Sequence, residues 1–141
     1  MFNTVFTLSS KGVYGVAALL ELAEYYRSGT LQIRDIAERR HIPQHYLEQI
    51  LVTLKRAGFI QSFRGARGGY ALSRHPDSIR LLEVLTTLEG PLALTGPGQT
   101  AEDTAFLWDD LEQHIATYLS RSLGDVLREK SQRAGDQDFI I

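Results

Sequence analysis

The segment from residue 36 to residue 72 constrains the fold more than any other part of this chain. Its sequence is IAERRHIPQHYLEQILVTLKRAGFIQSFRGARGGYAL. It predicts a short helix, a tight turn, a second helix, and two short strands joined by a loop that carries glycine and arginine. Apolar residues of the second helix recur at i, i+3, i+4 and i+7, the spacing of a helix with one buried face: Leu47, Ile50, Leu51 and Leu54.

The face of the second helix opposite this apolar stripe is mostly polar. At about 100° per residue, it carries His45, Gln49, Val52 and Arg56, and Glu48 lies at its edge. Such groups can hydrogen-bond to base edges in the major groove of DNA: Gln can pair with adenine, and Glu can accept from the cytosine amino group. The segment as a whole therefore predicts a winged helix-turn-helix.

Charge is unevenly distributed along the chain. The net charge of −2 does not by itself suggest a nucleic-acid binder. Residues 34–67, however, contain seven Lys or Arg against three Asp or Glu, a balance of +4, whereas residues 101–141 contain four against nine, a balance of −5. A local basic patch attracts phosphate whatever the average charge. Charge alone leaves DNA binding and two solvated faces of opposite sign as equal alternatives.

Basic residues in this segment are candidates for contacts with the DNA backbone. Arg64 and Arg67 lie on the predicted hairpin, where they can reach phosphates or enter a narrow minor groove. Others can position the protein on phosphates without specifying a sequence: Arg39, Arg40, Lys55 and Arg56. Lys11 completes the set of DNA-binding candidates. The alternative for each of them is an ordinary solvated side chain.

Outside this segment the sequence predicts mainly helices and loops. Ser9 and Ser10 are N-cap candidates for a first helix, and glycines at the hairpin tip permit a positive φ. Gly and Pro make residues 90–101 a loop. The predicted elements are helices at Lys11–Arg27, Arg34–Arg40, Gln44–Ala57, Leu81–Glu89, Asp103–Arg121 and Ser122–Gln132, strands at Phe59–Arg64 and Gly69–Ser73, and a strand edge at Leu31–Ile33.

The helix predicted from Asp103 carries an apolar stripe that is long for a helix at the end of a small domain. Its opposite face is acidic, with Asp109, Asp110 and Glu112. The stripe consists of Leu107, Trp108, Leu111, Ile115, Tyr118 and Leu119.

Several classes of protein are disfavoured. The chain has no cysteine, which excludes disulfides, a thiol redox sensor and thiolate metal sites, and fits a reducing cytoplasm. Residues 1–11 lack the pattern of a signal peptide, and the longest apolar run, Val16–Leu20, is too short to span a bilayer. The four histidines are scattered, the glycine loop lacks a Gly-Lys-Ser/Thr ending, and no nucleophile and base stand out. We therefore expect neither a metal site nor an enzyme. Separately, we expect Tyr46 to pack in the core rather than to stack on a base.

Four motifs together point to a known family. They are Leu8–Gly15, Asp35–Arg39, Tyr46–Leu51 and Arg64–Leu72, and weaker similarity continues through Ile79–Gly90 and Leu107–Trp108. On these motifs the chain resembles the IscR/NsrR/CymR (Rrf-two) family of bacterial winged-helix transcription regulators, over about residues 8–130. The Tyr-Leu-Glu-Gln helix and the wing pattern are specific in combination.

The resemblance implies roles for particular residues. It implies that His45, Glu48 and Gln49 face the major groove and that Arg64 enters the minor groove. It also implies a homodimer held by the long helix that begins near Asp103, in agreement with the apolar stripe. A two-fold dimer in turn predicts a palindromic operator.

One family feature does not carry over to this chain. Relatives that sense iron, nitric oxide or redox state bind an iron–sulfur cluster through cysteines in the loop before the dimerisation helix. The corresponding stretch, Leu92–Ala105, has none, and Ala105 stands at the place of a possible histidine ligand. Because such clusters need thiolate ligands, we expect no cluster. An unknown effector or a protein partner stays open.

The expected fold is mainly α with a small β-hairpin wing. We expect a winged helix-turn-helix domain in residues 1–90, a loop in 91–101, dimerisation helices in 102–132 and a tail in 133–141. The expected function is that of a cytoplasmic, homodimeric regulator that binds double-stranded DNA at a palindromic operator and represses transcription, without contact to a membrane. The alternative is a winged helix that binds another protein rather than specific DNA.

Overall fold

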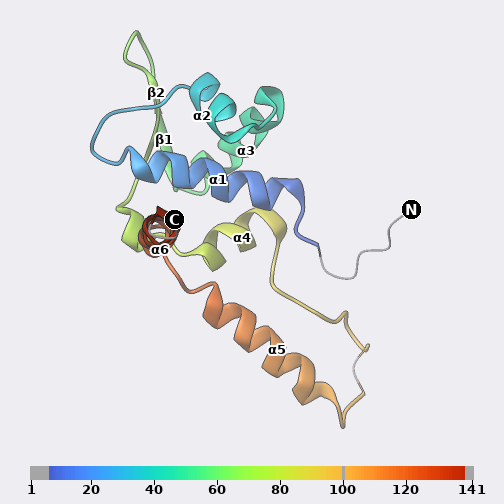
Figure 1. The fold of residues 1–141 in the computed structure, drawn as a ribbon. Coiled ribbons are helices and arrows are strands. Elements are labelled where there is room, and N and C mark those ends of the chain that lie inside the picture. The colour runs from blue at the N-terminus through green and yellow to red at the C-terminus, as the bar shows by residue number, and fades with distance from the viewer. Residues whose placement is uncertain (1–6, 100, 139–141) are drawn as a thin grey trace.

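Helices form most of residues 7–99 and 101–138, which are the residues that the computed structural model describes (Figure 1). A two-stranded antiparallel sheet forms the predicted wing. In chain order the elements are α1 (Ser10–Glu24), α2 (Ile33–Arg40), α3 (Gln44–Arg56), β1 (Ile60–Phe63), β2 (Gly69–Leu72), the short 3-10 helix η1 (Pro76–Ser78), α4 (Leu81–Glu89), α5 (Ala105–Tyr118) and α6 (Leu123–Asp138). The mainly helical fold with a β-hairpin wing is confirmed.

The predicted buried face of α3 lies at the centre of the core. The exposed fractions of Leu47, Ile50, Leu51 and Leu54 are all between 0% and 1%. The turn before α3 passes through His41, whose φ of 54° is left-handed and closes α2. The chain therefore reverses direction within three residues, and α2 and α3 pack against α1 as a helix-turn-helix.

The N-terminus of α1 is capped by a residue far away in the sequence. Ser9 is the N-cap, as predicted, but its hydroxyl donates to Glu89 at the end of α4 rather than accepting from its own helix. The Glu89 carboxylate also accepts the Gly12 amide at 2.9 Å. The hydroxyl of Ser9 is the main reason that the pKa of Glu89 is lowered. A Cβ at Gly15 would overlap Leu88, so this glycine lets α1 and α4 approach closely.

The wing is joined to the body along the edge of β2. Strand β1 pairs with β2 in the register Ile60–Leu72 to Phe63–Gly69. Leu31 and Tyr70 exchange two backbone hydrogen bonds, of 3.0 Å and 2.7 Å, which confirms the strand edge predicted at Leu31.

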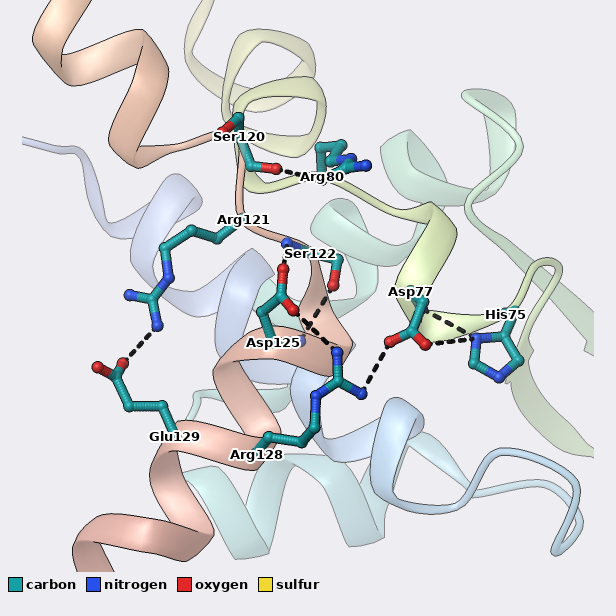
Figure 2. A network of polar contacts seen from close by, with 9 residues as sticks. All are labelled: His75, Asp77, Arg80, Ser120, Arg121, Ser122, Asp125, Arg128 and Glu129. Carbon is teal, nitrogen blue, oxygen red and sulfur yellow. Dashed lines mark hydrogen bonds and ion pairs between the residues drawn. The ribbon is translucent and has the colours of Figure 1, made fainter.

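Helix α6 belongs to the winged body. Leu123 is fully buried in the same core as α3, and α6 packs against α1 and η1. In Figure 2, Arg128 of α6 lies between two carboxylates, Asp77 of η1 at 3.1 Å and Asp125 at 2.8 Å. Of the two helices in the segment 102–132, which was predicted to hold the dimerisation helices, α6 thus packs on the body.

The start of α6 is a capping box that joins Ser122 to Asp125. The Ser122 hydroxyl accepts the Asp125 amide at 3.0 Å, and the Asp125 carboxylate accepts the Ser122 amide at 2.9 Å. The helix then continues to Asp138, so residues 133–138 are helical where the sequence predicted a tail. The predicted helix end at Gln132 was wrong, because the helix continues through polar residues. The apolar end, residues 139–141, lies outside the described residues.

Helix α5 points away from the body (Figure 1). None of its residues is buried. It is shorter than predicted, because residues 119–122 leave the helix to hydrogen-bond with the start of α4 and the residue before it. Leu81 and Leu82 donate to the carbonyls of Arg121 and Leu119 at 2.9 Å and 2.8 Å. Within the described ranges, no helix has both the length and the apolar character needed to cross a bilayer.

Candidate nucleic-acid interface

The outward face of α3 is presented to solvent as the sequence predicts. His45, Glu48, Gln49 and Arg56 are exposed, and Val52 in the middle of this face is 54% exposed. We call these five residues the reading face. An α-helix with such a face fits the major groove of DNA, where its polar groups can reach base edges and an apolar group can contact the thymine methyl.

Lys11 lies close to the N-terminal end of the reading face. It is exposed one turn before Tyr14, whose ring packs edge-on against Tyr46 of α3 at a centroid distance of 5.8 Å. Both tyrosines pack against the hydrophobic core, as expected for Tyr46. This contact between α1 and α3 brings the N-terminal half of α1, which carries Lys11, close to the start of α3.

The wing presents its arginines on an exposed loop. Arg64 and Arg67 are both exposed, and Gly65 between them has a φ of 100°. Arg67 also lines a polar hollow, together with Arg34 and Gln32 at the start of α2. Arg34 was not predicted as a site residue, because only the pairing of the wing with the α1–α2 loop brings it beside Arg67.

Lys55 connects the reading helix to the wing. Its ammonium donates to the Ser62 hydroxyl of β1 at 2.6 Å. An ammonium has three donor hydrogens, so this contact leaves capacity for a phosphate. The sequence predicted Lys55 as a phosphate contact, and the structure adds that its side chain joins α3 to β1.

The arginines at the end of α2 are engaged inside the protein. Glu21 of α1 is only 6% exposed, and its carboxylate accepts hydrogen bonds from Arg40 at 2.8 Å and Arg39 at 3.2 Å. Burial raises the pKa of Glu21, but the hydrogen bonds and charges of the two arginines outweigh it, so the pKa is lowered. The side chain of Arg40 is 19% exposed and lies 3.7 Å from Glu24. Arg40 therefore holds α1 to α2, a structural role that its prediction as a phosphate contact did not include.

Arg39 is more open than Arg40 but is also held in place. Its guanidinium lies 4.8 Å from the centre of the Tyr25 ring in addition to its ion pair with Glu21. The side chain is 42% exposed, so one edge of the guanidinium faces solvent. A DNA contact through Arg39 is therefore compatible with the structure, but it is shared with a structural role.

The predicted stripe on α5 divides into two parts. Leu111, Ile115 and Leu119 line a hollow of about 700 Å³ whose other wall is α4 and the loop at residues 90–94. Leu107, Trp108 and Tyr118 are exposed, and Leu111 is also 40% exposed although it borders the hollow. Phe106, off the predicted stripe, is exposed as well at 58%. We call α5 with these apolar residues the arm.

The loop before the arm is fixed by a carboxylate of the arm itself. Glu112 accepts the Leu94 amide at 2.7 Å.

Among the residues that the structure describes, no three histidine, aspartate or glutamate side chains gather in a way that would hold a metal ion.

Comparison with known proteins supports the same class. A family model described as "Rrf2: Iron-dependent Transcriptional regulator" matches residues 8–129. The transcriptional regulator CymR of Bacillus subtilis is 38% identical over 96 residues, which are 68% of this chain and 67% of that protein. IscR of Aliivibrio salmonicida is 34% identical over 142 residues, covering 94% of this chain and 84% of that protein. The solved structure of B. subtilis CymR, described as a global cysteine regulator, superposes with a TM-score of 0.80 at 32% identity over 86% of this chain and 95% of its own.

Fold, reading face and relatives together define a DNA-binding transcription regulator of the winged helix-turn-helix class. The chain belongs to the Rrf2 family, the Rrf-two family of the motif comparison above. It is a regulator and not an enzyme, and double-stranded DNA is its partner.

The word "iron" in the family description does not fit the donor groups of this chain. The sequence contains no cysteine, and the only carboxylates in the segment 92–105 are Glu102 and Asp103. Thiolates are the ligands that iron–sulfur clusters use. This segment offers no thiolate to such a cluster.

Proposed function

We propose that this protein acts as a homodimer that binds a palindromic operator and represses transcription in the cytoplasm. The observation that carries the proposal is the arm, a helix of 14 residues of which none is buried by its own chain. Isolated helices of this length are marginal in water. A second copy that covers the apolar residues of the arm would supply the missing burial.

A two-fold pairing of arms determines the direction and spacing of the half-sites in the operator. Two identical reading faces related by a two-fold axis match two half-sites of opposite direction, separated by a turn of the duplex or more. Repression needs only that such a dimer occupies a promoter, so no further active group is required.

Within each half-site the candidate residues have separate tasks. His45, Glu48 and Gln49 would read base edges in the major groove. Arg64 would enter the minor groove from the wing. Positioning on phosphates would fall to the remaining basic residues: Lys11, Arg39, Lys55, Arg56 and Arg67. These assignments agree with the exposure of all nine side chains.

The signal that controls the regulator is not an iron–sulfur cluster in this proposal, since the sequence has no thiolate ligand. An effector of another kind, or a protein partner, would act through the arm and its loop. Anaerobically purified protein should accordingly show no cluster absorption in the visible spectrum, and a cluster band would contradict this part of the proposal.

The central test is DNA selected from a random pool, followed by fluorescence anisotropy on the selected sequence at several salt concentrations. We expect an inverted repeat, and a slope of log affinity against log salt of about −0.9 per phosphate contact. Arg64→Ala should weaken binding to the selected sequence, whereas Arg133→Ala on α6 removes the same charge outside the interface and should not. Binding that ignores both sequence and salt would contradict DNA recognition.

A winged helix that binds a protein instead is the competing function. It would be favoured by a pool that yields no selected sequence together with a stable protein that co-purifies. The relatives named above are transcriptional regulators, which favours the DNA-binding function.

A further inference from the structure

The side chain of Thr30, in the loop between α1 and α2, contacts the loop of the wing. The hydroxyl of Thr30 lies 2.9 Å from the Arg67 carbonyl and 3.1 Å from the Gly68 carbonyl. A threonine hydroxyl has one hydrogen to donate, so the two carbonyls share it. Thr30 is 37 and 38 residues away from these partners in the sequence.

The backbone next to Thr30 shows how close this approach is. Leu31 pairs with Tyr70 through two backbone hydrogen bonds, and Gly69 between the two contacts has a φ of 141°. A Cβ at Gly69 would lie 2.5 Å from the Leu31 carbonyl oxygen. The body and the wing are thus in backbone contact on one side, at the base of the loop that carries the arginines.

The arginine loop itself has few other restraints. Residues 64–67 are exposed, and the ladder of β1 and β2 ends at Phe63 and Gly69. In the described part of the chain, the hydrogen bond from Thr30 is the one that joins residues 64–67 to a residue outside the hairpin. The atom it holds is the carbonyl of Arg67, so the contact sets the direction in which the Arg67 side chain leaves the backbone.

We propose that Thr30 is a positioning residue for DNA binding, whose hydroxyl fixes the wing loop so that Arg64 and Arg67 meet the DNA in one orientation. The inference rests on the proposed function. Pre-ordering of the loop lowers the entropy that its arginines lose on binding. Thr30 itself does not contact DNA in this arrangement, and its effect passes through the two arginines.

The test compares Thr30→Val, which keeps the shape and removes the hydroxyl, with Thr30→Ser, which keeps the hydroxyl. Affinity for the selected operator is measured by anisotropy. We expect Thr30→Val to weaken binding about threefold to tenfold, the worth of one hydrogen bond, and Thr30→Ser to recover most of it. We also expect Thr30→Val to lower the salt slope, by up to about 1 if the Arg67 phosphate contact is lost.

A double-mutant comparison separates positioning from a general structural role. In an Arg64→Ala/Arg67→Ala background, which keeps both backbone carbonyls, Thr30→Val should have no further effect on affinity. An equal loss in both backgrounds would overturn the proposal, as would a Thr30→Ser variant that binds as weakly as Thr30→Val.

Hydrogen exchange of the free protein gives a readout that does not depend on DNA. Thr30→Val should speed exchange of the amides of residues 65–69 while protection of α3 is unchanged. Unchanged exchange in the wing would overturn the proposal. Failure of the proposed function would be seen separately, as wild-type protein that selects no DNA sequence.

Discussion

The winged body, which consists of α1 to α4, the wing and α6, differs from the arm in the burial of its apolar side chains. Helices α1 to α4 and α6 bury apolar faces against one another, and nine of their large side chains are almost completely inaccessible. The arm has no buried residue, and its exposed apolar side chains range from 38% exposed at Trp108 to 63% at Tyr118. Contiguous exposed apolar surface of this kind marks an interaction site. The body is therefore complete within one chain, and the arm is not.

The junction between these regions is held by several hydrogen bonds. The carbonyls of Leu119, Ser120 and Arg121 are all held by residues 80–82 at the start of α4, with the Arg80 guanidinium 2.6 Å from the Ser120 carbonyl (Figure 2). The base of the arm is thus fixed to the body. In a dimer, this junction would transmit the pairing geometry to the two reading faces.

The largest expected effect is on the body. Leu51→Ala should lower the free energy of unfolding by about 2–5 kcal/mol, because it removes a fully buried side chain and leaves a cavity. Urea unfolding followed by circular dichroism would measure it at several protein concentrations. The loss should be the same at all of them. A loss confined to low concentrations would mean that the body, too, depends on the partner chain.

A substitution on the arm should weaken dimerisation and leave the body folded. Leu111→Asp should raise the dimer dissociation constant about 100-fold or more, equivalent to about 2.8 kcal/mol, because a charge would be buried in an apolar contact. Analytical ultracentrifugation would measure the dissociation, and circular dichroism should show a folded body. Gln113→Asp places the same charge about 200° away around the helix and is the matched control. A Leu111→Asp variant that stays dimeric would remove the arm from the interface.

The smallest expected effect is a pH-dependent change in the free energy of unfolding, caused by a substitution of Asp125 at the start of α6. The Ser122 amide, together with the Arg128 guanidinium and the Ser122 hydroxyl, holds the pKa of Asp125 at about 2, below its usual 3.8. A lowered pKa means that the carboxylate stabilises the folded state above pH 4 and loses this effect as the pH falls from about 4 to about 2. Asp125→Asn should therefore be less stable than wild type at neutral pH, and the difference should shrink over that range.

Unfolding in urea between pH 7 and pH 2.5 would show whether the difference closes. Asp109→Asn on the arm removes the same charge at an exposed position and is the control. A difference between wild type and Asp125→Asn that is constant with pH would contradict the assigned cause.

Much of the body was predictable because its signals are local. The apolar spacing of Leu47, Ile50, Leu51 and Leu54 placed the buried face of α3 correctly, and helix Leu81–Glu89 was predicted at its exact bounds. Prediction was weaker where a side chain serves another element. Arg40 had the sequence features of a surface cation, and only the packing of α1 on α2 brings it to the buried carboxylate of Glu21.

The sequence by itself determined the helix-turn-helix, the wing, the apolar stripe of the arm and the absence of thiolate ligands. The first three follow from periodicity and turn residues, which are signals within a few neighbouring residues. The last follows from composition alone. Tertiary structure alone decided that α6 joins the body, that Glu89 caps α1 and that Thr30 holds the wing. The last two contacts join residues 80 and 37 positions apart, and a hydrogen bond at such a distance exists only once the packed core has brought both partners together.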